Sequence, residues 1–240
     1  NVSMWVSVNS LITPNGSSNT AVYSRSAGAI QVQYQNNACG VVTGGSGTDS
    51  LHYIQNIIGS QFADTISGSR ASADRSIFDG QAGADVIDGG LGDDTIIGGA
   101  DNDTLTGGDG ADLFIFAAGS GQDVITDFQV GFDRIGTASG TYRSADQHGA
   151  DVLLTLNEGG TVLLKGVSLG LLTAANVVVA SPPASPQLPP SPPASPPPPS
   201  PPPPPPFPPL SPPVDHGGTF VAPRLLVQTT TAGQAQSYLG

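Results

Sequence analysis

The chain has 240 residues, which is room for one or two domains. Nineteen acidic residues against seven basic ones give a formal net charge of -12, so the chain lacks the basic surface that a nucleic-acid partner requires. The only cysteine, Cys39, excludes an internal disulfide, and we expect it to be a small buried strand residue.

Residues 1–50 contain short runs that alternate apolar and polar side chains. Examples are Trp-Val-Ser-Val at 5–8 and Ile-Gln-Val-Gln-Tyr at 30–34, separated by Gly, Asn and Ser. Alternation of this kind indicates β-strands joined by turns. We interpret residues 1–50 as a β-rich lead-in, the end of a larger region upstream.

Four consecutive nine-residue units occupy residues 80–115 without a break in phase. They read GQAGADVID, GGLGDDTII, GGADNDTLT and GGDGADLFI. An aspartate always holds position six: Asp85, Asp94, Asp103 and Asp112. A large apolar residue always holds position eight: Ile87, Ile96, Leu105 and Phe114. The pattern G-G-x-G-x-D-x-U-x resembles the RTX (repeats-in-toxin) family of calcium-binding nonapeptide repeats, of the serralysin and hemolysin type.

The resemblance implies an all-β fold, a right-handed parallel β-roll with flanking strands. In each unit the first six residues would form a turn and the last three a short strand, with two units completing one coil. Asp85 would then stack on Asp103, and Asp94 on Asp112. Several Ca²⁺ ions would be held between stacked turns by backbone carbonyls and one carboxylate from each turn. The implied metal-binding residues are Asp64, Gly80, Gly83, Asp85, Gly89, Gly90, Gly92, Asp94, Gly98, Gly99, Asp101, Asp103, Gly107, Gly108, Gly110, Asp112 and Asp123.

The acidic residues also support a cation. Nine aspartates and no Lys or Arg lie between Asp79 and Asp112, and the only glutamate of the chain is Glu158. A disordered acidic loop would lack the regular apolar positions. Without a cation, the repulsion between carboxylates on stacked turns opposes the compact state, and the core is narrow. We therefore expect the block to fold on binding calcium.

Around the four units, the resemblance extends from Gly28 to Val179. Residues 44–68 match the degenerate entry segment, in which Asp64 holds position six. The next unit carries a two-residue insertion within 70–75 and has Ser76 where Asp is expected. We assign residues 51–135 to the β-roll and 136–180 to capping strands, with a hairpin of 151–156 and 161–164 around Asn-Glu-Gly-Gly.

Residues 181–214 hold 21 prolines in Ser-Pro-Pro and longer runs. This composition predicts a disordered or polyproline II stalk. It resembles the hydroxyproline-rich cell-wall glycoproteins of plants and green algae, and a plain spacer is the alternative. Residues 215–240 are either a tail or the truncated start of another domain. The most apolar stretch, 161–180, is interrupted by Lys165 and Asn176, so we expect no transmembrane segment.

The sequence contains no convincing catalytic motif. Gly166-Val167-Ser168-Leu169-Gly170 matches G-x-S-x-G, but that motif needs a strand, a sharp turn and a helix, and its surroundings here are β-rich. The chain has no H-E-x-x-H zinc motif. We expect a chain that is not an enzyme by itself.

Two functions remain open. The first is a calcium-binding module of an extracellular, secreted or cell-wall protein, structural or adhesive, with calcium and either cell-wall polysaccharide or matrix proteins as partners. The second is the non-catalytic secretion and folding module of a secreted hydrolase or toxin whose catalytic domain lies outside this chain. The stalk favours the first.

Overall fold

A computed structural model describes residues 11–13, 19–34, 39–45 and 47–183. These residues form two β-sheets and two short 3₁₀ turns, which agrees with the all-β prediction. The strand predicted over residues 5–8, the stalk beyond residue 183 and the tail at 215–240 lie outside the described residues.

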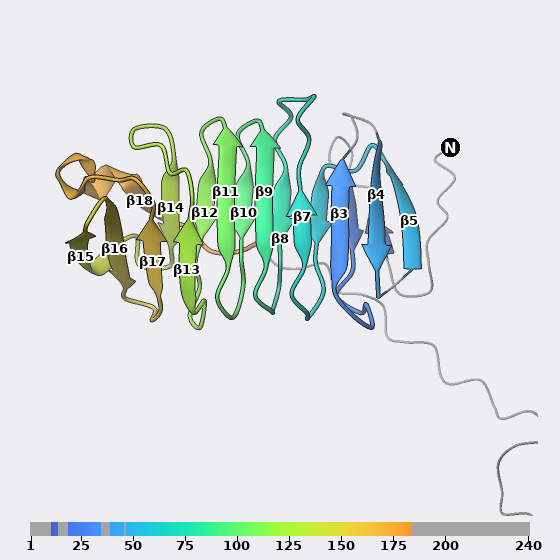
Figure 1. Cartoon of the computed structure of the whole chain (residues 1–240), viewed down its shortest axis with the longest axis horizontal. Coiled ribbons are helices and arrows are strands. Elements are labelled where there is room, and N and C mark those ends of the chain that lie inside the picture. The colour runs from blue at the N-terminus through green and yellow to red at the C-terminus, as the bar shows by residue number, and fades with distance from the viewer. Residues whose placement is uncertain (1–10, 14–18, 35–38, 46, 184–240) are drawn as a thin grey trace, which may run out of the picture. The chain divides into compact units, whose positions relative to one another are not determined.

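The two sheets lie face to face, and the chain alternates between them (Figure 1). Sheet A contains, in spatial order, β1 (Leu11–Thr13), β2 (Thr20–Val22), β6 (Asn56–Ile58), β8 (Ile77–Asp79), β10 (Thr95–Ile97), β12 (Leu113–Ile115), β14 (Arg134–Thr137) and β18 (Val177–Val179). Sheet B contains β15 (Tyr142–His148), β16 (Asp151–Leu156), β17 (Thr161–Leu164), β13 (Gln122–Ile125), β11 (Thr104–Asp109), β9 (Val86–Leu91), β7 (Thr65–Ser67), β3 (Ile30–Tyr34), β4 (Cys39–Gly44) and β5 (Gly47–His52). The 3₁₀ turns η1 (Leu169–Leu171) and η2 (Ala174–Asn176) lead into β18.

Parallel pairing joins units one coil apart, as the repeat predicts. In sheet B, Ile87 pairs with Leu105, and in sheet A, Ile96 pairs with Phe114. Strand length departs from the prediction on one side. The sheet A strands of the repeats span three residues, but β9 and β11 span six, because Gly90 also pairs with Gly108 in the ladder.

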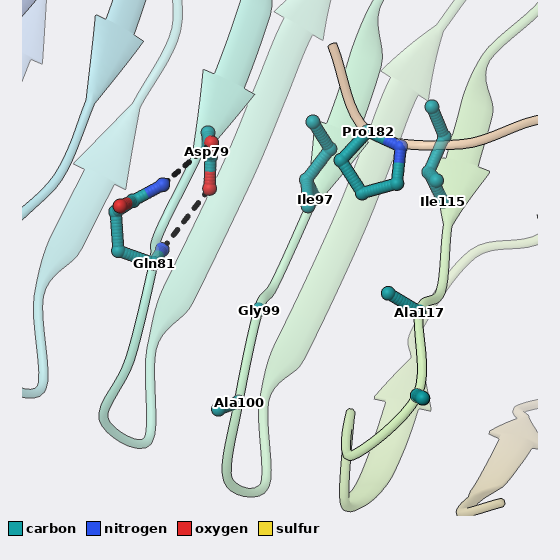
Figure 2. A pocket seen from close by; sticks show the side chains of 9 residues that line it. Asp79, Gln81, Ile97, Gly99, Ala100, Ile115, Ala117 and Pro182 are labelled. Atoms are coloured by element: carbon teal, nitrogen blue, oxygen red, sulfur yellow. Dashed lines mark hydrogen bonds between the residues drawn. The ribbon is translucent and has the colours of Figure 1, made fainter. Parts of the chain in front are cut away.

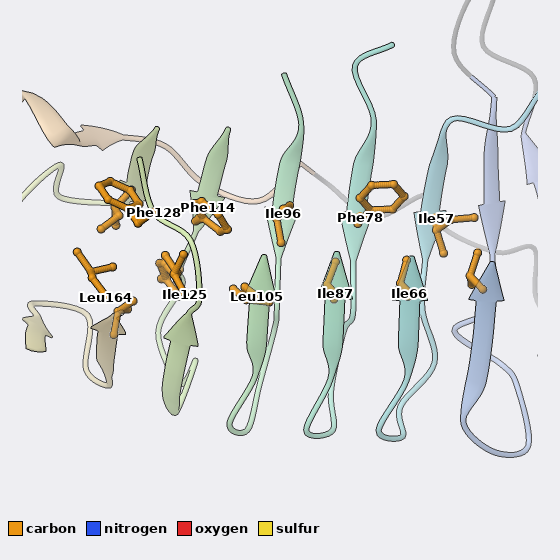
Figure 3. Packing of buried hydrophobic residues seen from close by; sticks show 14 of the residues in the cluster. Ile57, Ile66, Phe78, Ile87, Ile96, Leu105, Phe114, Ile125, Phe128 and Leu164 are labelled. Carbon is orange, nitrogen blue, oxygen red and sulfur yellow. The ribbon is translucent and has the colours of Figure 1, made fainter. Parts of the chain in front are cut away.

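The core is a double row of single apolar side chains between the sheets (Figure 3). Sheet A contributes Ile57, Phe78, Ile96 and Phe114, and sheet B contributes Ile66, Ile87, Leu105 and Ile125; all are fully buried. Each repeat therefore supplies one core side chain, at its eighth position. Such a core is only one side chain deep on each side.

The two sheets of the roll extend upstream of the repeat units. β2 and β3 pair in parallel with β6 and β7, so residues 20–34 already form part of the two sheets. The boundary expected at 50/51 falls within β5, and that at 135/136 falls within β14. The described residues on both sides of these positions share the same two sheets.

Antiparallel strands close both ends of sheet B. β3, β4 and β5 form a meander at one end, and β15, β16 and β17 form another at the opposite end. The predicted hairpin of 151–156 and 161–164 is present with these bounds. The two antiparallel meanders thus form the ends of sheet B, beyond the first and last parallel coils.

Three smaller expectations can be compared with the fold. Ser168 precedes the three-residue turn η1 instead of an α-helix, so the surroundings do not form a nucleophile elbow. Cys39 is half-buried at the start of β4, with its Sγ 3.4 Å from His52 Nδ1, which corrects the expectation of a buried thiol. Among the described residues, no helix has the length and apolarity needed to cross a membrane.

Candidate metal centre

Position-six aspartates form two ladders, one where the strands of sheet B begin and one where those of sheet A begin. In each ladder the Oδ1 atom of one aspartate accepts a hydrogen bond from the backbone N–H one coil earlier. The period of the repeat places these residues in register. Their side chains are almost fully buried, with 1–2 % exposure for Asp85, Asp94, Asp103, Asp112 and Asp123. The ladders are therefore both structural ties and lines of buried carboxylates.

The sheet B ladder has four aspartates. Asp64 N donates to Asp85 Oδ1 at 2.7 Å, and Asp85 N donates to Asp103 Oδ1 at 2.8 Å. Asp103 N then donates to Asp123 Oδ1 at 3.0 Å. The predicted stacking of Asp85 on Asp103 is thus observed, and Asp64 and Asp123 extend it.

The sheet A ladder begins at Ser76, which occupies an aspartate position. Ser76 N donates to Asp94 Oδ1 at 2.8 Å, and Asp94 N donates to Asp112 Oδ1 at 2.9 Å. Asp112 N donates to Asp133 Oδ1 at 3.0 Å. Asp94 stacks on Asp112 as predicted, but Ser76 brings no carboxylate to the first step.

Five of these carboxylates keep one oxygen without a partner. The buried Oδ2 atoms of Asp85, Asp94, Asp103, Asp112 and Asp123 accept no hydrogen bond from the protein. A buried, unpaired carboxylate oxygen costs free energy, and native proteins usually satisfy such atoms. Each of these five oxygens is satisfied only when a proton or a cation is bound.

Burial raises the pKa of all five carboxyls. The loss of solvation raises the pKa of Asp85 and of Asp94 to about 8, and that of Asp103 to about 7. It raises the pKa of Asp112 and of Asp123 to about 6. Neighbouring aspartates raise four of these pKa values further, since Asp103 repels Asp85 and Asp112 repels Asp94. The protein alone does not favour their charged forms, which a bound cation would favour.

Glycines make room beside four of the five free oxygens, those of Asp85, Asp94, Asp103 and Asp112. A Cβ at Gly89 would lie 2.6 Å from Gly107 O of the next coil and 2.9 Å from Asp94 Oδ2. At Gly80, a Cβ would collide with Asp85 Oδ2 and would lie 2.5 Å from Gly98 O. A carboxylate and a carbonyl from two stacked turns thus converge where the first glycine of the unit has no side chain.

The donor set fits a hard cation. Calcium takes six to eight oxygen ligands, including carboxylates and backbone carbonyls, and these are the atoms that converge at the glycines. Within the described ranges, no group of three or more His, Cys, Asp or Glu side chains gathers around one point. That result agrees with sites that draw one carboxylate from each turn and take their other ligands from the backbone.

Two consensus glycines are replaced, yet their turns keep the same backbone shape. Gln81 has φ 78° and Asp101 has φ 79°, whereas the equivalent Gly90 has φ 93° and Gly92 has φ 117°. Asp101, a predicted ligand, is exposed, and its Oδ2 accepts from Gly83 N at 3.3 Å instead of joining a ladder. The left-handed backbone is therefore retained at some strain in both residues.

Asp64 differs from the other predicted ligands. Its Oδ2 accepts from Ser60 N at 2.6 Å and its Oδ1 from Ser60 Oγ at 2.7 Å, so both oxygens have protein partners within their own turn. Ser60 here stands at the position of the second glycine. The Oδ1 atom of Asp64 also accepts from Ile30 N of β3 at 2.7 Å, so the ladder continues to β3 and Asp64 has no free oxygen.

One ladder residue, Asp133, and one buried side chain beside a ladder, Ser120, were not predicted from the sequence. Asp133 ends the sheet A ladder, but its Oδ2 accepts from Gln129 N at 2.8 Å, so it resembles Asp64. Its signal was present as Asp133-Arg134-Ile135, an aspartate two residues before a core side chain. Ser120 carries a buried Oγ without a hydrogen-bond partner in the turn that ends at Asp123, and no motif marks it.

The fold and the site define a parallel β-roll of two sheets with one buried acidic turn per unit. The family model of the RTX calcium-binding nonapeptide repeat matches this chain in four copies, at residues 79–114 and 88–125. RTX repeat modules of this kind are non-catalytic. The comparison with curated proteins found no match.

Several solved structures are similar. The extracellular lipase LipA from Serratia marcescens is 22 % identical with a TM-score of 0.40, and the match covers 63 % of this chain and 31 % of the lipase. The AlgE6R2 subunit of the Azotobacter vinelandii mannuronan C5-epimerase is 29 % identical with a TM-score of 0.42, covering 53 % of this chain and 94 % of the subunit. The AlgE6R3 subunit of the same epimerase is 28 % identical with a TM-score of 0.40, covering 51 % and 83 %. This chain thus spans about a third of the lipase it matches.

Proposed function

We propose that this chain is a calcium-dependent structural module of a secreted protein, and that several calcium ions complete its folding. The observation that supports this most directly is the set of five buried carboxylate oxygens without a protein partner. At the pH of an extracellular fluid, the fold must either protonate these groups or neutralise them with a cation. Divalent ions shared between stacked turns would do the latter.

The calcium ligands would come from both ladders. In the sheet B ladder, Asp85, Asp103 and Asp123 would each present Oδ2, joined by carbonyls such as Gly98 O. In the sheet A ladder, Asp94 and Asp112 would do the same, joined by Gly107 O. Bound calcium would supply positive charge that offsets desolvation and mutual repulsion of the carboxylates.

The thin core explains why folding would depend on the ion. Each repeat buries one large apolar side chain, while its glycines lose much backbone freedom on folding. Ligand binding to the folded state alone adds stability that increases with ligand concentration. Because the apolar core alone gives a free energy of folding close to zero, calcium binding would shift the equilibrium to the folded state.

Far-ultraviolet circular dichroism of the chain tests this dependence. We expect little β signal in the calcium-stripped protein, a cooperative gain on adding calcium, and a much smaller gain with the same concentration of magnesium, which demands a stricter octahedral geometry. A β signal that is unchanged by removing calcium would contradict the proposal.

The calcium affinity expected of an extracellular module indicates in which compartment the chain would fold. Extracellular calcium modules work at roughly 10⁻⁴–10⁻³ M, and sites in that range would fill only after export. We infer a structural or adhesive role outside the cell, with cell-wall polysaccharide or matrix proteins as partners. A submicromolar dissociation constant for calcium, measured by isothermal titration calorimetry, would contradict folding triggered by export. A catalytic domain in the full reading frame would instead make this chain the module of a secreted hydrolase or toxin.

A further inference from the structure

We propose that a hollow on the outer face of sheet A binds the side chain of a lysine from a protein partner, and that the Asp79 carboxylate receives its ammonium group. The hollow lies outside the two aspartate ladders, so the inference goes beyond the proposed calcium function. It depends on the folded sheet and not on which ion stabilises it.

The outer face of sheet A carries an apolar row that contains one acid. Register places Ile58 beside Asp79 and Asp79 beside Ile97, and Ile115 follows on the next strand. The three isoleucines are outside the core between the sheets, yet they are only 4–7 % exposed. Asp79 itself is 5 % exposed. A carboxylate therefore lies among isoleucines, where water reaches it poorly.

Sheet B provides the internal comparison, because its strands come from the same repeats. There Asp88, which like Asp79 precedes the first glycine of a unit, lies between Ser67 and Thr106 on a polar outer face and forms an ion pair with Arg70. No Lys or Arg among the described residues forms an ion pair with Asp79. A buried acid without a basic partner costs free energy, which a cation from outside the described chain would offset.

Gln81, which replaces a consensus glycine, holds the Asp79 carboxylate in place. Its backbone N–H donates to Asp79 Oδ1 at 3.2 Å, and its Nε2 donates to Asp79 Oδ2 at 2.7 Å. Gln81 does this with a φ of 78°, a conformation that strains every residue except glycine. Two departures from the repeat thus bond to each other, and a strained residue that fixes a polar group is a feature of binding sites.

Asp79 and Gln81 lie at one side of an open hollow, and Ile97, Pro182 and Ile115 line the rest of it (Figure 2). The hollow has a volume of about 230 Å³. Sites for whole small molecules usually measure roughly 300–1,000 Å³, so this hollow fits a single side chain better. Because it is open to solvent, the backbone that carries such a side chain can remain outside.

A lysine side chain matches both parts of this lining. Its methylene stem can pack along Ile97 and Pro182 while the ammonium group reaches Asp79. Each Asp79 oxygen accepts a hydrogen bond from Gln81 and keeps a lone pair, which suits an ammonium group that binds as a point charge. An arginine would instead need both oxygens for its planar fork, and both already have neutral donors. The carboxylate and the apolar wall together therefore favour lysine.

Nuclear magnetic resonance titration of the full calcium-loaded chain tests the site, with N-acetyl-lysine methylamide as the probe. We expect the backbone amides of Gln81, Gly99 and Ala117 to shift with a millimolar dissociation constant, as befits one side chain. The norleucine analogue has the same four-carbon stem without the charge. It should bind about tenfold more weakly, because it cannot make the charged hydrogen bond to Asp79.

Three variants locate the binding. Asp79→Asn should remove the preference for the lysine probe over the norleucine analogue, because the amide keeps the size of the side chain but not its charge. Asp88→Asn is the matched control on sheet B and should leave that preference unchanged. Ala117→Leu would fill the hollow from its lining and should abolish binding of both probes.

The outcomes separate this site from its alternatives and from the proposed function. Equal affinity for the two probes, no shift at these amides, or shifts confined to the turns of the aspartate ladders would overturn the site. Tighter binding of the arginine analogue would overturn the assignment to lysine. A chain that stays unfolded with calcium would contradict both proposals, while a chain folded without calcium would contradict only calcium-dependent folding, since the titration still reports on the hollow.

Discussion

At the residue scale, each buried aspartate of the ladders has two separate roles. Its Oδ1 atom accepts a backbone hydrogen bond that joins two coils, and in five aspartates the Oδ2 atom has no protein partner. The first role contributes to the fold with or without metal. The second makes the residue unfavourable in the folded chain unless a proton or a cation is bound.

Asp103→Asn separates these two roles. The amide oxygen can still accept from Asp85 N, but the negative charge is lost. We expect calcium affinity to fall roughly tenfold, because the charge of the ligand set tunes affinity. Isothermal titration calorimetry measures this, with the exposed Asp109→Asn as the matched control. Equal isotherms for both variants would rule out Asp103 as a ligand.

The raised pKa values predict an opposite pH dependence for the two states of the roll. Burial raises the pKa of Asp85 and Asp94 from 3.8 to about 8, so the folded calcium-free chain holds protons that the unfolded chain releases. Stability of the calcium-free fold should be fully present below about pH 4 and decline as pH rises toward 8. Calcium affinity should rise over the same range, because the ion competes with those protons.

The β signal in far-ultraviolet circular dichroism of calcium-stripped protein, compared at pH 4.5 and pH 8, measures the first effect as the fraction of folded chain, and calcium titrations across that range measure the second. The exposed Asp109→Asn variant should follow the parent in both. Greater calcium-free stability at pH 8 than at pH 4.5 would contradict the assigned cause.

At the element scale, each turn serves the coil before it and the coil after it. The glycine that begins a unit leaves space for the carboxylate of its own turn and the carbonyl of the next coil, as Gly89 does for Asp94 and Gly107. A turn is therefore complete only when its neighbour is in register. The step from Ser76 to Asp94 is the incomplete one, because Ser76 has no charge to contribute.

Ser76→Asp should complete that step, with effects of opposite sign in the two states. Adding a half-buried carboxylate next to Asp94 should lower the stability of the calcium-free chain through repulsion. With saturating calcium the same change should raise the unfolding midpoint and tighten binding. Thermal unfolding at saturating calcium measures the second effect, and the residual β signal of the calcium-stripped chain measures the first. Exposed Ser168→Asp controls for net charge. An unfolding midpoint that is lowered at saturating calcium would contradict a shared site at this step.

At the scale of the two sheets, the ends matter as much as the repeats. Parallel coils leave open edges, and sheet B is finished by the β3–β4–β5 and β15–β16–β17 meanders. Leu154 and Val162 of the second meander are fully buried and belong to the same apolar cluster as Leu105. Loss of packing in the cap should therefore weaken the entire described roll.

Leu154→Ala tests this coupling. Removing a buried leucine side chain should lower the free energy of unfolding of the calcium-loaded chain by about 2–4 kcal/mol without changing the number of ions bound. Val86→Ala, at a side chain that is 48 % exposed, should change it by less than about 0.5 kcal/mol. Urea unfolding at saturating calcium gives both values. Loss of calcium sites in Leu154→Ala would show that the cap acts on the ladders directly.

Strict spacing explains what could be predicted about the site. Asp85 and Asp103, like Asp94 and Asp112, are 18 residues apart, and their stacking follows from two units per coil. Asp133 lies 21 residues after Asp112 because the intervening turn is longer, so the period does not reach it. The satisfied state of Asp64 depends on the Ser60 hydroxyl and amide and on the backbone N–H of Ile30, and the repeat pattern does not specify the serine.

The amino-acid sequence alone determined the repeat, the all-β roll, the core positions and the acidic turns, because a nine-residue period dictates local geometry without reference to distant parts of the chain. Only the tertiary structure decided which carboxylates remain unpaired, that residues 20–34 join the sheets, and that one outer face is apolar. These properties depend on contacts between segments far apart in sequence, and such contacts exist only once the coils are stacked.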